Sequence, residues 1–212
     1  MSDAASAPPG VTASTPSGTL VCVGGSPGAG KTTVGALVAA GGGLCLVDLD
    51  SVTTQLVEAF AASLGSVADL DSPRFAALRE ARYACLGEVV ADNLRAGRSV
   101  VAVAPFTAEA ADADAWRERA LAWGAARVVL CWLDLDPTQA AARAAARGLP
   151  RDLAKAARAP GGASAVGERA ASGVVDRDRI DVVLDGSGDP GVSCAAVLTV
   201  LTAPSRPGTM PP

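Results

Sequence analysis

Residues 25–32 read Gly25-Ser26-Pro27-Gly28-Ala29-Gly30-Lys31-Thr32, a stretch that matches the pattern G-x-x-x-x-G-K-[ST] at every position. It directly follows the apolar run at 20–23, in the way that a phosphate-binding loop (P-loop) follows its strand. Glycine lets the backbone turn tightly and direct successive N–H groups at an anion, and the helix expected to begin near Lys31 adds the positive end of its dipole. The stretch therefore predicts a site for the phosphates of a nucleotide.

Each residue of this loop is expected to contact the nucleotide or its metal ion. Lys31 would reach the β- and γ-phosphates, and the Thr32 hydroxyl would ligate Mg²⁺. The remaining contacts are assigned to the rest of the loop and to the residue after it: Gly25, Ser26, Pro27, Gly28, Ala29, Gly30 and Thr33. The predicted cofactors are ATP and Mg²⁺.

The composition excludes several kinds of chemistry. The chain of 212 residues contains no histidine, which excludes Ser-His and Cys-His catalysis and His-ligated zinc. A general base therefore has to be a carboxylate or, failing that, a lysine. A net charge of −4 and an aromatic content of 3% are opposite to the basic, ring-bearing surface of a nucleic-acid binder. Nucleic acid is not an expected partner.

The cysteines and the N-terminal residues favour a cytoplasmic location. The five cysteines are scattered without a C-x-x-C pair, and three of them lie in apolar runs, where reduced cysteine behaves as a small hydrophobic residue. Residues 1–18 lack the basic start and apolar stretch of a signal peptide. No run approaches the roughly 18 apolar residues of a membrane span.

The chain alternates between short apolar runs and helical patterns. Residues 1–18 and 204–212, rich in Pro and small residues, are expected to be disordered tails around one domain at 19–203. Strands are predicted at 19–24, 44–49, 99–104, 127–133 and 180–184. Their alternation with helices predicts an α/β fold in which a five-stranded parallel sheet carries helices on both faces.

Three helices have readable ends. The helix after the P-loop should end at the glycines 41–43. A second should begin at Ser72-Pro73 and run to Ala96, where Gly97 closes it. A third should begin at Asp136-Pro137, and it opens a predicted lid at about 137–165.

Ligands of such sheets bind beyond the carboxyl ends of the strands. This rule selects the P-loop, two aspartates after the second strand, and the segments 105–107, 134–136 and 186–188. Asp50 is the predicted general base that accepts the proton of an acceptor hydroxyl, although the same residue could cap the helix expected from Ser51. Asp48 is the competing carboxylate and is assigned, with Thr32, to the metal.

Arg143, Arg147 and Arg151 recur every four residues in the predicted lid. At this spacing the first two share a helix face, and together the three could form a cationic arc over the transferred phosphate. A solvated helix face is the alternative interpretation. The glycine- and alanine-rich stretch 159–165 after them could allow the lid to move.

From the P-loop through Arg151-Asp152 the chain resembles small P-loop kinase-like proteins, often called AAA-domain ATP-binding proteins. These are related to zeta-toxin, polynucleotide-kinase and chloramphenicol-phosphotransferase enzymes. The residues that carry the resemblance are 25–32, Asp48-Leu49-Asp50, Tyr83 with 97–101, Ala104-Pro105-Phe106, Arg143-x-x-x-Arg147 and Arg151-Asp152.

The resemblance implies a nucleoside-monophosphate-kinase-like core in which Lys31 and Thr32 bind ATP and Mg²⁺. It also implies that the aspartate after the second strand is the general base and that the arginines belong to the lid. One position departs from the family pattern, because Val103 stands where many relatives carry an aspartate in the third strand.

The sequence thus predicts an ATP-dependent phosphotransferase acting on a hydroxyl of a small-molecule acceptor. The alternative is a nucleotide-binding module or slow ATPase that transfers no phosphate. A zeta-like kinase of nucleotide-sugars with an antitoxin partner is a third possibility. Candidate residues for the acceptor pocket, which could equally be helix surface or core, are Gln55, Arg79, Arg82, Tyr83 and Phe106.

Overall fold

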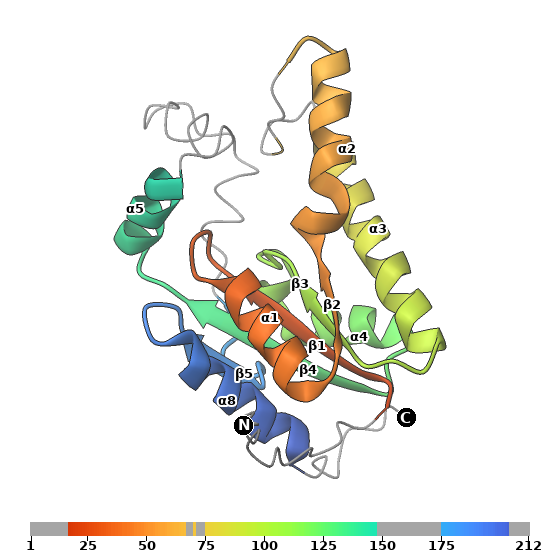
Figure 1. The fold of residues 1–212 in the computed structure, drawn as a ribbon, viewed down its shortest axis with the longest axis vertical. Helices are drawn as coiled ribbons and strands as arrows, with labels where there is room; N and C mark the ends of the chain where they lie inside the picture. Colours follow the sequence, from red (N-terminus) through yellow and green to blue (C-terminus); the bar gives the residue numbers. More distant parts are fainter. Residues whose placement is uncertain (1–16, 67–69, 71–74, 148–174, 204–212) are drawn as a thin grey trace, which may run out of the picture.

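A computed structural model of the chain describes residues 17–66, 70, 75–147 and 175–203. Its five strands form one parallel sheet in the order β2-β3-β1-β4-β5 (Figure 1). The strands are β1 Thr19–Gly25, β2 Cys45–Asp48, β3 Val100–Val103, β4 Arg127–Asp134 and β5 Val182–Asp185. The predicted α/β fold is confirmed, and each predicted strand is present.

Helices cover both faces of this sheet, as predicted (Figure 1). On one face lie α1 and α8, and on the other lie α3 and α4. α2 leaves the carboxyl end of β2 and packs along α3. The bounds are α1 Lys31–Gly42, α2 Leu49–Ser63, α3 Ala76–Arg95, the short 3-10 helix η2 Glu109–Ala111, α4 Ala113–Ala122, α5 Pro137–Arg147 and α8 Pro190–Thr202.

The central strands explain why the sheet needs both helical layers. Along β1, Leu20 and Cys22 belong to the core under α3 and α4, whereas Val21 and Val23 belong to the core under α1 and α8. All four side chains are fully buried. Alternate residues of a strand point to opposite faces, so a continuous apolar run requires cover on both sides.

The helix ends follow the predicted signals where they are described. Gly43 with φ of 64° ends α1, and Gly97 with φ of 76° follows α3. Asp136 caps α5, since its Oδ1 accepts hydrogen bonds from the amides of Thr138 at 2.9 Å and Gln139 at 3.3 Å. The predicted start at Ser72-Pro73 lies outside the described residues.

Several predicted segments fall wholly or largely outside the described residues. Of the predicted N-terminal tail, residues 17 and 18 are described. The predicted C-terminal tail, 204–212, and the predicted lid beyond Arg147 lie outside the described residues. The first part of the predicted lid is helix α5. Among the helices of the described ranges, none combines the length and the apolar character needed to cross a membrane.

Close packing between α1 and β3 generates a first prediction. A Cβ atom added at Gly35 would lie 2.4 Å from Cγ2 of the buried Val103. We therefore expect Gly35→Ala to lower the free energy of unfolding by about 1–2 kcal/mol, although alanine favours helix by about 1 kcal/mol. The measurement is urea unfolding.

Val103→Ala provides the matched partner for a double-mutant cycle. Because it removes the clashing methyl groups, Gly35→Ala should be neutral or stabilising in the Val103→Ala background. A coupling free energy below about 0.5 kcal/mol between the two substitutions would contradict the proposed contact.

Candidate functional site

The P-loop joins the end of β1 to the start of α1 in the conformation that phosphate binding needs. Gly28 and Gly30 have φ of 82° and 88°, values that residues with a Cβ rarely adopt. At Gly25 an added Cβ would lie 2.6 Å from the carbonyl oxygen of Leu133 on β4. No side chain of the described residues caps α1 at Gly30, so the helix presents its first N–H groups to the loop.

The ammonium group of Lys31 lies against this loop. Its Nζ donates hydrogen bonds to the carbonyl oxygens of Gly25 at 2.9 Å and Ser26 at 2.8 Å. The side chain thus bends back from the first residue of α1 toward the end of β1. A positive charge is therefore already held at the carbonyl oxygens at the start of the loop.

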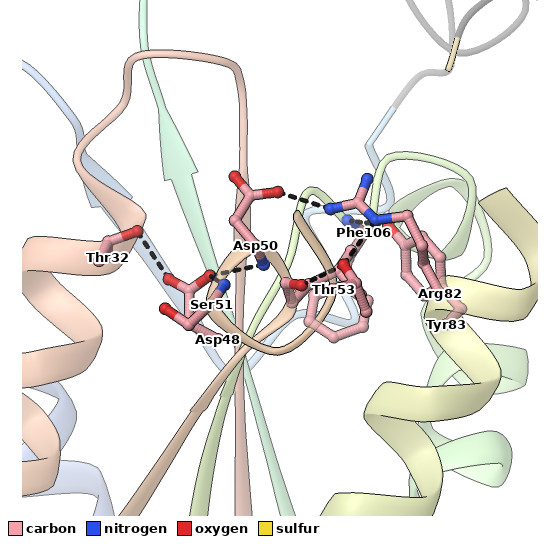
Figure 2. Close-up of polar contacts among 9 residues, drawn as sticks. Thr32, Asp48, Asp50, Ser51, Thr53, Arg82, Tyr83 and Phe106 are labelled. Atoms are coloured by element: carbon pink, nitrogen blue, oxygen red, sulfur yellow. Dashed lines mark hydrogen bonds and ion pairs between the residues drawn. The ribbon is translucent and has the colours of Figure 1, made fainter. Parts of the chain in front are cut away.

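Asp48, the last residue of β2, links the P-loop helix to α2 (Figure 2). Its Oδ2 accepts a hydrogen bond from the Thr32 hydroxyl at 2.8 Å. Its Oδ1 accepts from the amides of Asp50 at 2.8 Å and Ser51 at 3.4 Å. Asp48 is therefore the N-cap of α2, which begins at Leu49. The alternative interpretation of Asp50 as the cap is wrong, because the helix begins two residues earlier than expected.

The pair of Thr32 and Asp48 fits a magnesium ion. A hydroxyl and a carboxylate oxygen 2.8 Å apart are hard oxygen donors that could share one cation. Within the described ranges, no group of three or more metal-binding side chains exists. A site with so few protein ligands suits Mg²⁺, which keeps several waters and binds mainly to substrate phosphates.

Asp50 is held from the opposite side by Arg82 of α3 (Figure 2). Arg82 Nη2 lies 2.6 Å from Asp50 Oδ1, with the arginine side chain 9% and the aspartate side chain 48% exposed. Arg82 Nε donates to the Thr53 hydroxyl at 2.7 Å, and this hydroxyl donates to the Leu49 carbonyl oxygen. The buried guanidinium thus positions a half-exposed carboxylate at the edge of the sheet.

Tyr83 and Phe106 lie next to this ion pair (Figure 2). The Phe106 amide donates to the Tyr83 hydroxyl oxygen at 3.1 Å, and the two rings meet edge to face. Phe106 adopts φ of 49°, and the Pro105 carbonyl oxygen accepts from the Gly25 amide. Burial raises the pKa of Tyr83, so its hydroxyl stays protonated at neutral pH.

Of the five acceptor-pocket candidates, the structure brings together Arg82, Tyr83 and Phe106. The Phe106 side chain is 1% exposed and packs in the core against Trp116, as the core interpretation predicts. Arg79 lies one turn before Arg82 on α3, and Gln55 is exposed on α2. Sequence reasoning left Arg82 among these candidates and missed its contact with Asp50. The spacing of the two residues, 32 apart, carries no local signal of this contact.

Arg143 reaches the P-loop from α5. Its Nη1 donates to the carbonyl oxygens of Gly28 at 3.3 Å and Gly186 at 2.7 Å. Gly186 opens the turn after β5, where hydrogen bonds from the Ser187 hydroxyl and amide lower the pKa of Asp185. Arg143 therefore connects α5 to two loops of the site.

The other two lid arginines are less fully described. Arg147 is the last residue of α5, and its side chain lies outside the described residues, as does all of Arg151. The prediction that the three arginines close over the phosphates stays a prediction.

Comparison with known proteins identifies the family. A family model described as AAA domain matches residues 20–163. The chain belongs to this AAA-domain family. No curated protein sequence matches it significantly.

Solved structures share the fold of this AAA-domain protein. A gluconokinase from Sinorhizobium meliloti is 18% identical with a TM-score of 0.56, over 89% of this chain and 93% of that chain. A sugar kinase from Janibacter sp. has the same identity and TM-score, over 85% and 92%. Shikimate kinase from Aquifex aeolicus is 16% identical with a TM-score of 0.50, over 86% and 95%. At these identities the likeness concerns the fold.

In this AAA-domain protein, Val103 lies beside Asp48 in the sheet and contributes no oxygen to the pair of Thr32 and Asp48. It is the Cα partner of Asp48 in the sheet and is 2% exposed. Its side chain belongs to the core under α1. The carboxylate close to Thr32 thus comes from β2 rather than from β3.

Thr53 generates a second prediction. Thr53→Val keeps the shape of the side chain but removes the oxygen that accepts from Arg82 Nε. A buried, charged donor without its acceptor should lower the free energy of unfolding by about 1–3 kcal/mol. Urea unfolding of the variant measures this loss.

Thr54→Val is the matched control on the next residue of α2. Thr54 is half-buried, and we expect its replacement to change the free energy of unfolding by less than about 0.5 kcal/mol. Equal stability of the Thr53 and Thr54 variants would show that the hydrogen bond to Arg82 contributes nothing.

Proposed function

We propose that this chain is an ATP-dependent phosphotransferase that acts on a hydroxyl of a small-molecule acceptor. The observation that carries the proposal is the pair of aspartates at the end of β2. One carboxylate faces the P-loop threonine, and the other is turned to Arg82 on the acceptor side. Two carboxylates with separate partners can serve separate roles, metal binding and proton acceptance.

In the proposed reaction the P-loop and the N-terminus of α1 hold the triphosphate, with Lys31 at its β- and γ-phosphates. Mg²⁺ bound by Thr32 and Asp48 would neutralise charge on these phosphates. The acceptor hydroxyl gives its proton to the Asp50 carboxylate as its oxygen forms a bond to the γ-phosphorus. The bond between that phosphorus and the bridging oxygen breaks, and ADP leaves.

The lid arginines complete the proposed site. Arg143, Arg147 and Arg151 would stabilise charge on the transferred group when the lid closes. The fold is shared with a gluconokinase, a sugar kinase and a shikimate kinase, proteins named for phosphate transfer to a small molecule. This supports a small hydroxyl compound as acceptor.

A nucleotide-binding module or slow ATPase is the second candidate function. The observation that favours it is Val103, because β3 offers no carboxylate beside Asp48 to support the metal. A screen of hydroxyl compounds for acceptor-dependent release of ADP separates the two functions. Release that no compound accelerates would favour the binding module.

Lys31 gives the third prediction. Lys31→Ala removes the ammonium that lies on the P-loop carbonyls, and ATP affinity or turnover should fall at least about tenfold while the fold is kept. Calorimetric titration with ATP and Mg²⁺ measures affinity, and circular dichroism checks the fold. Unchanged binding and turnover would remove the P-loop from the proposed mechanism.

Asp50 gives the fourth prediction. Asp50→Asn keeps the size of the side chain but removes its basicity, so acceptor phosphorylation should slow by about 10²- to 10⁴-fold while ATP affinity is kept. Asp48→Asn, measured in parallel, should instead weaken binding of ATP with Mg²⁺. Full activity of Asp50→Asn would show that Asp50 is not the base. If Asp48→Asn alone lost activity, Asp48 would be the catalytic carboxylate instead.

A further inference from the structure

Arg82 of α3 contacts the proposed base, Arg79 lies one turn away on the same helix, and the mechanism above does not use their remaining donors. Arg82 donates hydrogen bonds from Nη2 to Asp50 and from Nε to Thr53. In Figure 2 its third nitrogen, Nη1, points away from the strands, and among the described residues no acceptor is bonded to it. One side of this buried guanidinium is therefore turned toward the space above Asp50.

Arg79 precedes Arg82 by three residues, which places both on one face of α3. α3 begins above the carboxyl edge of the sheet (Figure 1), and Arg79 is one turn nearer to this beginning than Arg82. The charges of Arg82 and Arg79 both act to lower the pKa of Tyr83 against the larger effect of burial. Both guanidinium groups are thus close to the same phenol.

The Nε of Arg79 is buried and has no hydrogen-bond partner. Two tryptophan Nε1 atoms share this condition within the described part of the chain, but Arg79 alone carries a charge. Buried donors are rarely left without an acceptor, and a charged one is the most costly. Because Arg79 lies one helical turn from Arg82, which binds the proposed base, this donor suits an acceptor atom that arrives with a ligand.

The nearby carboxylates Asp50 and Glu109 do not accept a hydrogen bond from the Nε of Arg79. Asp50 is paired with Arg82, and Glu109, whose side chain is 10% exposed, is paired with Arg119 of α4. Burial raises the pKa of Glu109. Arg82 is paired with Asp50, whereas the buried Nε of Arg79 has no acceptor, and an oxyanion bound beside Arg82 could supply one.

We propose that the acceptor carries an anionic group, a carboxylate or a phosphate, which Arg79 and Arg82 bind while its hydroxyl faces Asp50. This inference rests on the proposed function and names the class of its substrate. Guanidinium groups bind both kinds of oxyanion through paired N–H donors. A neutral polyol could accept hydrogen bonds from these donors but would supply no negative charge to pair with the guanidinium groups.

The test compares acceptors that share a carbon skeleton. Glycerol, glycerate and glycerol 3-phosphate form one set, and glucose, gluconate and glucose 6-phosphate form another. Binding to the full chain is measured by calorimetry with Mg²⁺ and a non-hydrolysable ATP analogue, and ADP release is measured with ATP. We expect an anionic member of at least one set to bind about tenfold or more tightly than its neutral counterpart. The preferred anion tells carboxylate from phosphate.

Arg79→Gln should weaken binding of that anion about tenfold to a hundredfold and leave ATP affinity unchanged. Arg79→Lys keeps the charge, and its affinity for the anion should lie between those of the unmodified chain and Arg79→Gln. This variant preserves the test if the glutamine variant folds poorly. Arg95→Gln is the matched control, since Arg95 lies at the other end of α3 and forms an ion pair with the exposed Asp92. Arg95→Gln should change neither the affinity for the anion nor the affinity for ATP.

Several outcomes would overturn the inference. They are equal binding of neutral and anionic members, no binding by any anionic member, and unchanged anion binding in both Arg79 variants. Tight anion binding that depends on Arg79 without ADP release would keep the inference and reject phosphate transfer instead. The two proposals therefore fail separately.

Discussion

The carboxylate of Asp48 is the constraint on which the rest of the site depends. One oxygen accepts from the P-loop threonine and the other from the first amides of α2. A single buried residue thus fixes the distance between α1, which follows the P-loop, and α2, which carries Asp50. Because the carboxylate is rigid and both oxygens are occupied, α1 and α2 cannot be displaced independently without breaking one of these bonds.

A second constraint is the burial of Arg82. A guanidinium that leaves water must find partners, since an unpaired buried charge is strongly unfavourable. Thr53 and Asp50 supply them, and Thr53 is itself tied to the turn of helix before it. The electrostatic requirement of the buried Arg82 therefore orients the Asp50 carboxylate, the base of the proposed reaction.

The two constraints meet across Asp50. Its amide donates to Asp48, and its carboxylate accepts from Arg82 (Figure 2). The phosphate side and the acceptor side of the proposed reaction are thus connected through the backbone and side chain of one residue. Close placement of this kind, rather than covalent chemistry by the protein, is what phosphoryl transfer requires.

Much of the fold was readable from the sequence, because its signals are local. The loop pattern at 25–32, the buried runs of the five strands and the glycines after α1 and α3 depend on neighbours within a few residues. The edge of the sheet where ligands bind followed from chain direction alone. These signals also placed Asp48 and Asp50 together beyond β2.

What the two aspartates do was decided by tertiary structure. Asp48 is the N-cap of α2 and Asp50 is not, because α2 begins at Leu49, directly after the last residue of β2. Arg82 reaches Asp50 from 32 residues away, and Arg143 reaches Gly28 from 115 residues away. Such contacts depend on how α3 and α5 pack around the sheet. No periodicity or spacing along the chain encodes that packing, because it arises from the shared burial of distant side chains.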